Sequence, residues 1–237
     1  MSERQRTTAS GVLTFAREPH RRGAMRVDSW WGRALLRAIE ERAYDDNQLT
    51  GARALARSGR IGGLVVEAGR FAAAVEDERG LWTVTGAVPV LDADSAAALS
   101  EVVGASTSRI EALLAGELPL DVAEHAEEAG VELVPYGDEL SVTCTCGHWH
   151  SVCGHSLAVL HQLCWVVDRD ASVLLQLRGV ARDELLGRLR QHRRRSAAPD
   201  AVRAGMAGGP GEPTRDQVDD VEIALDAVLR ARHMLEE

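Results

Sequence analysis

The sequence contains no lysine, and all 27 of its basic residues other than histidine are arginine. A codon bias toward high GC content explains this more simply than a function does, although the planar guanidinium group suits carboxylates and phosphates. The chain also lacks any run approaching the roughly 20 apolar residues that a membrane-spanning helix needs. Met1–Ser10 is polar and shows no secretory signal. These absences predict a cytoplasmic protein with no membrane partner.

Net positive charge is also missing. The 237 residues carry a formal charge of -9, and 45% of them are hydrophobic. An acidic chain of this kind is a poor candidate for a protein that coats nucleic acid without regard to sequence. The length allows one large domain or two small ones, each with a buried core.

Cysteine is scarce, and its distribution is informative. The four cysteines are Cys144, Cys146, Cys153 and Cys164, so all of them lie in one short part of the chain. A disulfide framework would scatter them along the sequence. Clustered thiols in a reducing compartment favour a metal site instead.

The pattern along the chain predicts an α+β fold with a small antiparallel sheet. We expect an Arg-rich arm over 1–27, an α+β domain with a three-stranded sheet over 28–135, and a zinc-stapled hairpin–helix module with following helices over 136–195. A linker rich in Ala, Gly and Pro follows over 196–213, and an amphipathic helix over 214–237, which either folds back or docks on a partner.

The clearest strand signals lie in the first half. Ile61–Glu67, Arg70–Glu76 and Leu81–Val90 are β-rich segments separated by short turns, which is typical of hairpins. We expect helices against one face of this sheet. Gly11–Phe15 is either an edge strand or part of a mobile arm.

Several helices are predicted from apolar periodicity and capping residues. They are 30–39 after Asp28 and Ser29, 51–57, 96–103 capped by Asp94, 106–115, 120–129 after Pro119, 156–167, 173–177 and 183–189. Val131–Tyr136 is expected to be extended. Trp30 and Trp31 pack in the core, or alternatively form an exposed platform on which a base could stack.

One motif carries specific chemistry: Cys144 and Cys146, six further residues, and then Cys153 and His155. Three thiolates and one imidazole form a standard closed set of ligands for tetrahedral zinc. Two residues one apart lie on the same side of an extended strand, and Gly147 allows the bend that returns the second pair. The second pair begins a helix, whose dipole favours the thiolate of Cys153.

Other assignments of these residues remain open. His148 or His150 could replace His155 as the fourth ligand, and the thiols could be structural or redox-active without metal. Cys164 and His161 lie further along the helix, where a small core residue is the usual role of a cysteine.

The arrangement resembles the SWIM-type zinc finger, whose pattern is Cys-x-Cys, a variable gap and Cys-x-His. The likeness extends to the Trp-Trp-Gly-Arg helix, the Gly51–Arg60 segment and Leu177–Gly179, which resemble parts of bacterial SWIM-finger proteins. The resemblance implies zinc binding and a role beside nucleic acid or another protein. Bacterial members are associated with SWI/SNF-type helicase-like ATPases, so such an enzyme is the expected partner.

Family members often carry a basic residue before the ligand histidine, where this chain has Gly154. The neighbouring sequence is acidic, with Glu111, Glu117, Asp121, Glu124, Glu127, Glu128, Glu132, Asp138, Glu139 and Asp168. A phosphate contact requires positive charge. We therefore expect the finger to be a poor direct reader of DNA.

The Arg-rich flanks offer the alternative contact surface for nucleic acid or an acidic partner. They comprise Arg17, Arg21, Arg22 and Arg26 at one end and Arg188, Arg190, Arg193, Arg194 and Arg195 at the other. The last three also fit the solvated C-terminal end of a helix.

No set of catalytic residues stands out. The sequence therefore predicts a zinc-stabilised, non-enzymatic interaction module, and loss of Cys153 is expected to release zinc and unfold 140–170.

Overall fold

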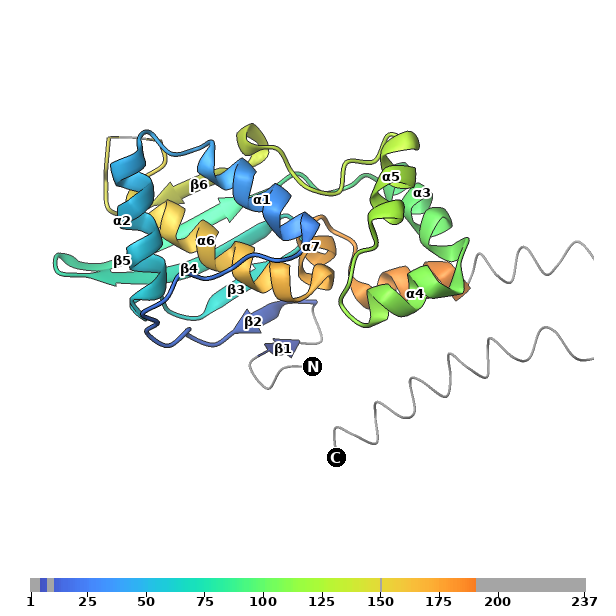
Figure 1. Ribbon diagram of the computed structural model, residues 1–237, viewed down its shortest axis with the longest axis horizontal. Coiled ribbons are helices and arrows are strands. Elements are labelled where there is room, and N and C mark those ends of the chain that lie inside the picture. The colour runs from blue at the N-terminus through green and yellow to red at the C-terminus, as the bar shows by residue number, and fades with distance from the viewer. Residues whose placement is uncertain (1–4, 8–10, 150, 191–237) are drawn as a thin grey trace, which may run out of the picture. The chain divides into compact units, whose positions relative to one another are not determined.

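A computed structural model describes residues 5–7, 11–149 and 151–190, which all belong to the first of two compact units, Met1–Arg195 and Ser196–Glu237 (Figure 1). This part of the chain is an α+β fold, as predicted. The predicted linker over 196–213, the C-terminal helix over 214–237 and Arg193, Arg194 and Arg195 lie outside the described residues.

The centre of the fold is an antiparallel sheet whose strands follow their order in the sequence. The strands are β1 (Gln5–Thr7), β2 (Leu13–Phe15), β3 (Leu64–Glu67), β4 (Arg70–Asp77), β5 (Gly80–Ala87) and β6 (Ser141–Cys144). The three predicted strands are β3, β4 and β5.

The predicted size of the sheet, three strands, is wrong, because the sheet has six strands among the described residues. In a three-stranded sheet, β3 and β5 would be the edge strands and would each expose unpaired backbone groups. Here β2, from the predicted arm, pairs with β3, and β6, from the predicted zinc module, pairs with β5. The sheet therefore contains strands from the predicted α+β domain over 28–135 and from the predicted zinc module over 136–195.

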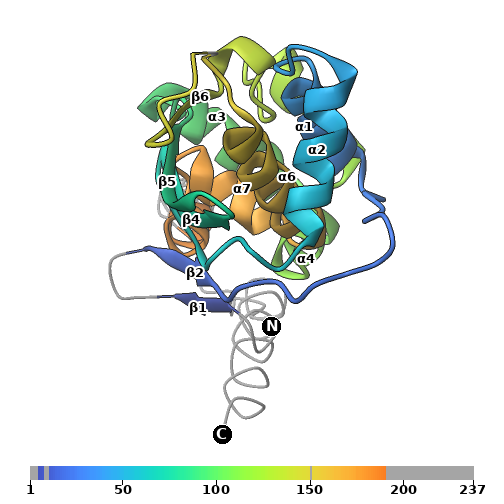
Figure 2. The same cartoon turned by 90° about the vertical axis from the view of Figure 1, so that its left-hand side faces the viewer.

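Three helices cover one face of the sheet (Figures 1 and 2). They are α1 (Trp30–Glu40), α2 (Asp46–Arg57) and α6 (Gly154–Arg169). Every residue of α6 from Ser156 to Val167 is buried, because the helix lies between the sheet and the other two helices. A helix that is apolar around most of its circumference needs such a position.

A second group of helices lies at one end of the sheet in Figure 1. It contains α3 (Ala93–Gly104), α4 (Thr107–Leu114), α5 (Leu120–Glu128), α7 (Ala171–Leu177) and a helical segment over 182–190. Asp92 caps α3 by accepting a hydrogen bond from the Ser95 amide, so the predicted cap, Asp94, lies in the first turn instead. Val131–Tyr136 contains no strand, and η1 (Gly137–Glu139) follows it.

The two tryptophans of α1 pack inward. The Trp31 indole nitrogen donates to the Val167 carbonyl at 2.9 Å, and that of Trp30 donates to the Leu118 carbonyl at 2.7 Å. Trp31 is buried and Trp30 is half-buried. The packing alternative therefore describes them better than the stacking platform.

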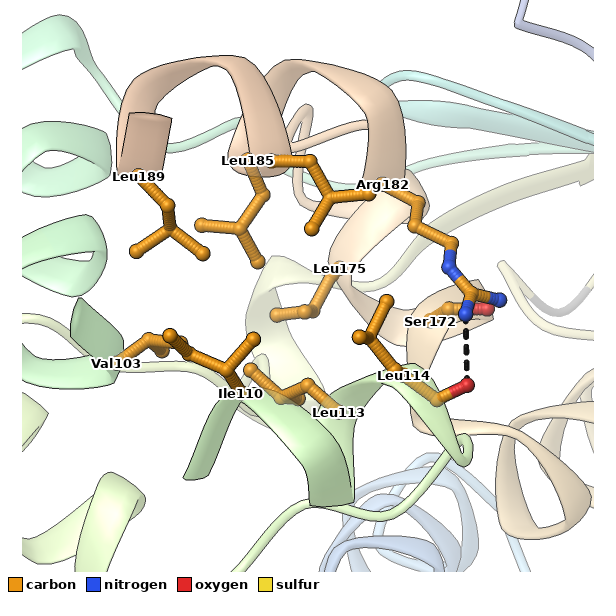
Figure 3. A pocket seen from close by; sticks show the side chains of 10 residues that line it. Val103, Ile110, Leu113, Leu114, Ser172, Leu175, Arg182, Leu185 and Leu189 are labelled. Atoms are coloured by element: carbon orange, nitrogen blue, oxygen red, sulfur yellow. Dashed lines mark hydrogen bonds between the residues drawn. The ribbon is translucent and has the colours of Figure 1, made fainter. Parts of the chain in front are cut away.

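The helical group lines a small, partly open cavity of about 20 Å³ (Figure 3). Its lining is almost entirely apolar and comes from α3, α4, α7 and residues 182–190, and Arg182 donates across its edge to the Leu114 carbonyl at 2.7 Å. Its volume is close to that of one water molecule, so it is a packing gap and offers no room for a substrate.

Candidate metal centre

Four predicted ligand residues meet at one place. Cys144 ends β6, Cys146 lies in the turn that follows, Cys153 is the N-cap residue of α6, and His155 lies in the first turn of that helix. One ligand atom from each lies within 4.8 Å of the others. Zinc–sulfur bonds of about 2.3 Å in a tetrahedron would place sulfur atoms roughly 3.8 Å apart, so the cluster fits this metal.

The backbone explains why these residues converge. Cys144 is paired with Val84 in the β5–β6 ladder, and the Thr145 amide continues that ladder by donating to the Thr83 carbonyl. Gly147 then adopts a positive φ of 65°, which glycine tolerates best. The part of the loop that leads into α6 is held by Gln48, whose side-chain amide donates to the Val152 carbonyl at 2.9 Å.

His155 is oriented by the tip of the β4–β5 hairpin. Its Nε2 atom lies 3.0 Å from Oδ2 of Asp77, and its Nδ1 atom lies 3.8 Å from the sulfur of Cys144. The Trp82 ring stacks beside the imidazole at 6.0 Å between centroids. An Nε2 hydrogen donated to Asp77 leaves the Nδ1 lone pair facing the thiols, which is the tautomer that a metal requires.

Asp77 itself is held as a carboxylate. Its Oδ1 atom accepts hydrogen bonds from the Trp82 indole at 2.9 Å and from the backbone amides of Arg79 and Gly80. The Trp82 hydrogen bond, with the backbone amides and His155, lowers the pKa of Asp77 to about 2. The sequence pattern gives no signal for Asp77, since 78 positions separate it from His155.

Two thiols of the cluster, Cys144 and Cys153, differ in their pKa. Burial raises the pKa of Cys144 to about 12. Burial also acts to raise the pKa of Cys153, but hydrogen bonds from the Ser156 hydroxyl and amide outweigh it and lower that pKa. The N-terminus of α6 thus favours the thiolate form of Cys153. A bound cation would supply the positive charge that stabilises the thiolate forms of Cys144 and Cys146.

The other thiol and imidazole groups named above lie elsewhere. Cys164 is buried in α6, where its thiol donates to the Gly32 carbonyl, and burial raises its pKa to about 12. His161 is buried on the same helix. His148 stacks on Trp149 and is not part of the cluster of described residues. His150 lies outside the described residues.

Half of the acidic residues that lie near the motif in sequence are distant from it in space. Five of the ten belong to α4 and α5, in the helical group at the opposite end of the fold from α2 and β6 (Figure 1). Asp77, on the hairpin tip, contacts His155 and is followed by Glu78 and Arg79. Asp45 and Asp46 follow Tyr44, whose ring contacts Trp149 in the loop between the ligand pairs. Carboxylates near the cluster therefore include residues other than the ten that the sequence suggested.

The described arginines of the two flanks are partly engaged within the protein. Arg17 lies 3.9 Å from Glu76, Arg21 pairs with Glu18 at 3.2 Å, and Arg188 pairs with Glu184 at 2.8 Å. Arg22, Arg26 and Arg190 are exposed.

Comparison with known proteins gives one informative similarity. The chain is 29% identical over 191 residues to the uncharacterized protein Rv2102 of Mycobacterium tuberculosis, covering 80% of this chain and 68% of that relative. No family model and no solved structure matches the chain. Among the described residues, no helix has the length and apolar character needed to cross a membrane.

Proposed function

We propose that the protein is a non-catalytic, zinc-binding interaction module of the SWIM type. The observation that carries this proposal is the meeting of Cys144, Cys146, Cys153 and His155 within 4.8 Å. Zinc would join the last strand of the sheet to the central helix α6, so its chemistry would be structural. Four protein ligands complete a tetrahedron and leave no position for a substrate or an activated water.

The spacing of the ligands and the helix that starts at the second pair support the SWIM assignment. A SWI/SNF-type helicase-like ATPase as the partner rests on that resemblance alone. Direct nucleic-acid binding through the Arg-rich flanks is the weaker alternative, since Arg17, Arg21 and Arg188 already pair with carboxylates. It predicts binding that falls steeply with salt and with replacement of Arg193, Arg194 and Arg195 by alanine.

The structure also changes what loss of zinc should do. Because α6 is buried in the main core, we do not expect 140–170 to unfold separately. Its apolar contacts with α1 and α2 remain when the metal leaves. The loop between the two ligand pairs should lose its structure, and the whole fold should become less stable.

The test compares Cys153→Ser with Cys164→Ser. The first variant should lose bound zinc, as measured by elemental analysis of the purified protein, and should unfold at a lower denaturant concentration. The second should keep one zinc per chain, since Cys164 faces Gly32 and not the cluster. Full zinc occupancy in Cys153→Ser would contradict the proposed site.

A further inference from the structure

An exposed aromatic cluster lies beside the candidate metal centre. Trp149 in the loop between the ligand pairs is 79% exposed, and Tyr44, in the loop between α1 and α2, is 69% exposed. Their ring centroids are 6.2 Å apart with an edge-to-face geometry, and His148 stacks on Trp149 at 6.0 Å. We refer to Tyr44, His148 and Trp149 as the aromatic patch. Tryptophan is highly buried on average in folded proteins, so its exposure here calls for an explanation.

Hydrogen bonds within the fold hold the two segments of the aromatic patch together. Gln48 accepts a hydrogen bond from the Tyr44 amide at 2.8 Å and donates one to the Val152 carbonyl at 2.9 Å. One side chain thus ties the segment that carries Tyr44 to the loop that carries Trp149. A surface whose rings are already placed loses less conformational entropy when a partner binds.

The charges around the patch indicate which partner it fits. Asp45 and Asp46 directly follow Tyr44 and are exposed, whereas residues 141–153 contain no arginine. The nearest arginine in sequence, Arg42, is half-buried. On the nearby hairpin tip, the exposed Arg79 is accompanied by Asp77 and Glu78, so carboxylates outnumber arginines around the patch. Carboxylates repel phosphates, and a base-stacking surface for nucleic acid therefore lacks the excess of positive charge that it needs. Aromatic faces beside carboxylates instead attract arginine and lysine side chains.

We propose that the aromatic patch binds a basic segment of a partner protein, with an arginine or lysine side chain placed over Trp149 and held by Asp46. This inference rests on the proposed interaction function, and it names the surface and the chemistry of the partner. The metal would act by fixing the loop that presents Trp149.

The test follows the indole N–H signals of the zinc-loaded protein by NMR. The chain has five tryptophans, and Trp149→Phe identifies the signal of interest. A peptide of alternating glycine and arginine, added to millimolar concentration, should shift this signal saturably. Peptides in which glutamine or glutamate replaces arginine should not. The indoles of Trp30 and Trp31 donate to backbone carbonyls away from the metal centre and serve as internal references.

Single substitutions test which residues bind the arginine peptide. Asp46→Asn and Tyr44→Ala should each weaken binding about two- to fivefold, the range of an exposed cation–π contact. Asp45 is left unchanged because its carboxylate caps α2 through the Gln48 amide. Tyr136→Ala is the control and should have no effect on binding. Tyr136 is also an exposed aromatic residue, at 58%, but it is the N-cap residue of η1 and not a member of the aromatic patch.

Three outcomes would overturn the proposal: no shift with the arginine peptide, a larger shift with a single-stranded oligothymidine, or self-association of the protein that Trp149→Ala abolishes. Each leaves the zinc assignment intact, because metal content is measured separately. Equal binding by the chelated protein would support the patch and contradict only the role of the metal in presenting it.

Discussion

A single carboxylate outside the candidate metal centre controls how that centre is arranged. Asp77 contacts none of the thiols, yet it fixes the ring of His155 through a 3.0 Å hydrogen bond and is itself fixed by Trp82 and two backbone amides. Partners of this kind orient metal-binding imidazoles and raise their basicity.

Replacing Asp77 with asparagine should lower the affinity for zinc. The amide can still accept the Trp82 hydrogen bond, but it lacks the negative charge that orients and polarises His155. We expect an affinity about 10- to 100-fold lower, measured by competition with a chromogenic chelator. Glu78→Gln is the matched control, since Glu78 is exposed on the same hairpin. Equal affinities for both variants would show that Asp77 has no such role.

The contrast between the ligands and Asp77 shows what residue patterns can reveal. The spacing of Cys144, Cys146, Cys153 and His155 was sufficient to group them, because short spacing in sequence forces closeness in space. Asp77 carries no such signal: it is one of 36 acidic residues, and only the pairing of β4, β5 and β6 brings it to His155.

At the scale of elements, the strongly patterned segments were predictable. The apolar run of α6 and the strands β3, β4 and β5 were recognised, and β2 corresponds to the strand alternative for Gly11–Phe15. By contrast, β1 and β6 were not predicted, because they contain three and four residues, too few for a periodic pattern. They become strands because β2 and β5 offer unpaired edges, which is a tertiary effect.

The burial of α6 leads to a prediction about pH. His161 is 3% exposed, and no described residue makes a hydrogen bond to its Nε2 atom. Burial lowers its pKa to about 4, from an ordinary value of 6.5. The unfolded chain therefore binds a proton between these values that the folded chain does not. The stability associated with a neutral His161 is complete above pH 6.5 and is lost as pH falls toward 4.

Denaturant unfolding at a series of pH values should reveal this effect. The wild-type free energy of unfolding should fall by up to about 3 kcal/mol from pH 7 to pH 4 on account of this residue, at about 1.4 kcal/mol per pKa unit. His161→Leu should show a smaller fall, whereas His20→Gln, at an exposed position, should behave as the wild type. Acid release of zinc affects all three proteins alike, so the difference in slope is the measurement. Identical slopes for wild type and His161→Leu would contradict the assignment.

At the scale of the whole molecule, segments expected to be separate are joined into one fold. The predicted arm over 1–27 contributes β1 and β2 to the sheet, and the predicted finger contributes β6 and the central helix. Sequence composition suggested an arm because arginines crowd this region. It could not show that Gly11 accepts a hydrogen bond from Gln176, or that Glu18 lies beside Arg169.

Glu18 offers the sharpest test of that integration. It is 8% exposed and accepts from Arg169 at 2.7 Å and from Arg21 at 3.2 Å, and these cations lower its pKa against the opposing effect of burial. Glu18→Gln leaves two guanidinium groups without their counter-charge. Because Arg169 is itself 42% exposed, solvent compensates in part, and we expect a loss of about 1–3 kcal/mol in unfolding free energy.

The matched control is Glu76→Gln. Glu76 is an exposed side chain that lies 3.9 Å from Arg17, a longer ion pair than those of Glu18. Its loss should lower the unfolding free energy by less than about 0.5 kcal/mol. Both values come from denaturant unfolding followed by circular dichroism. If the arm were only loosely attached, the two substitutions would have the same small effect. A larger loss for Glu18→Gln means that residues 11–21 unfold together with α6, since a carboxylate in a detached segment cannot stabilise the core to which Arg169 belongs.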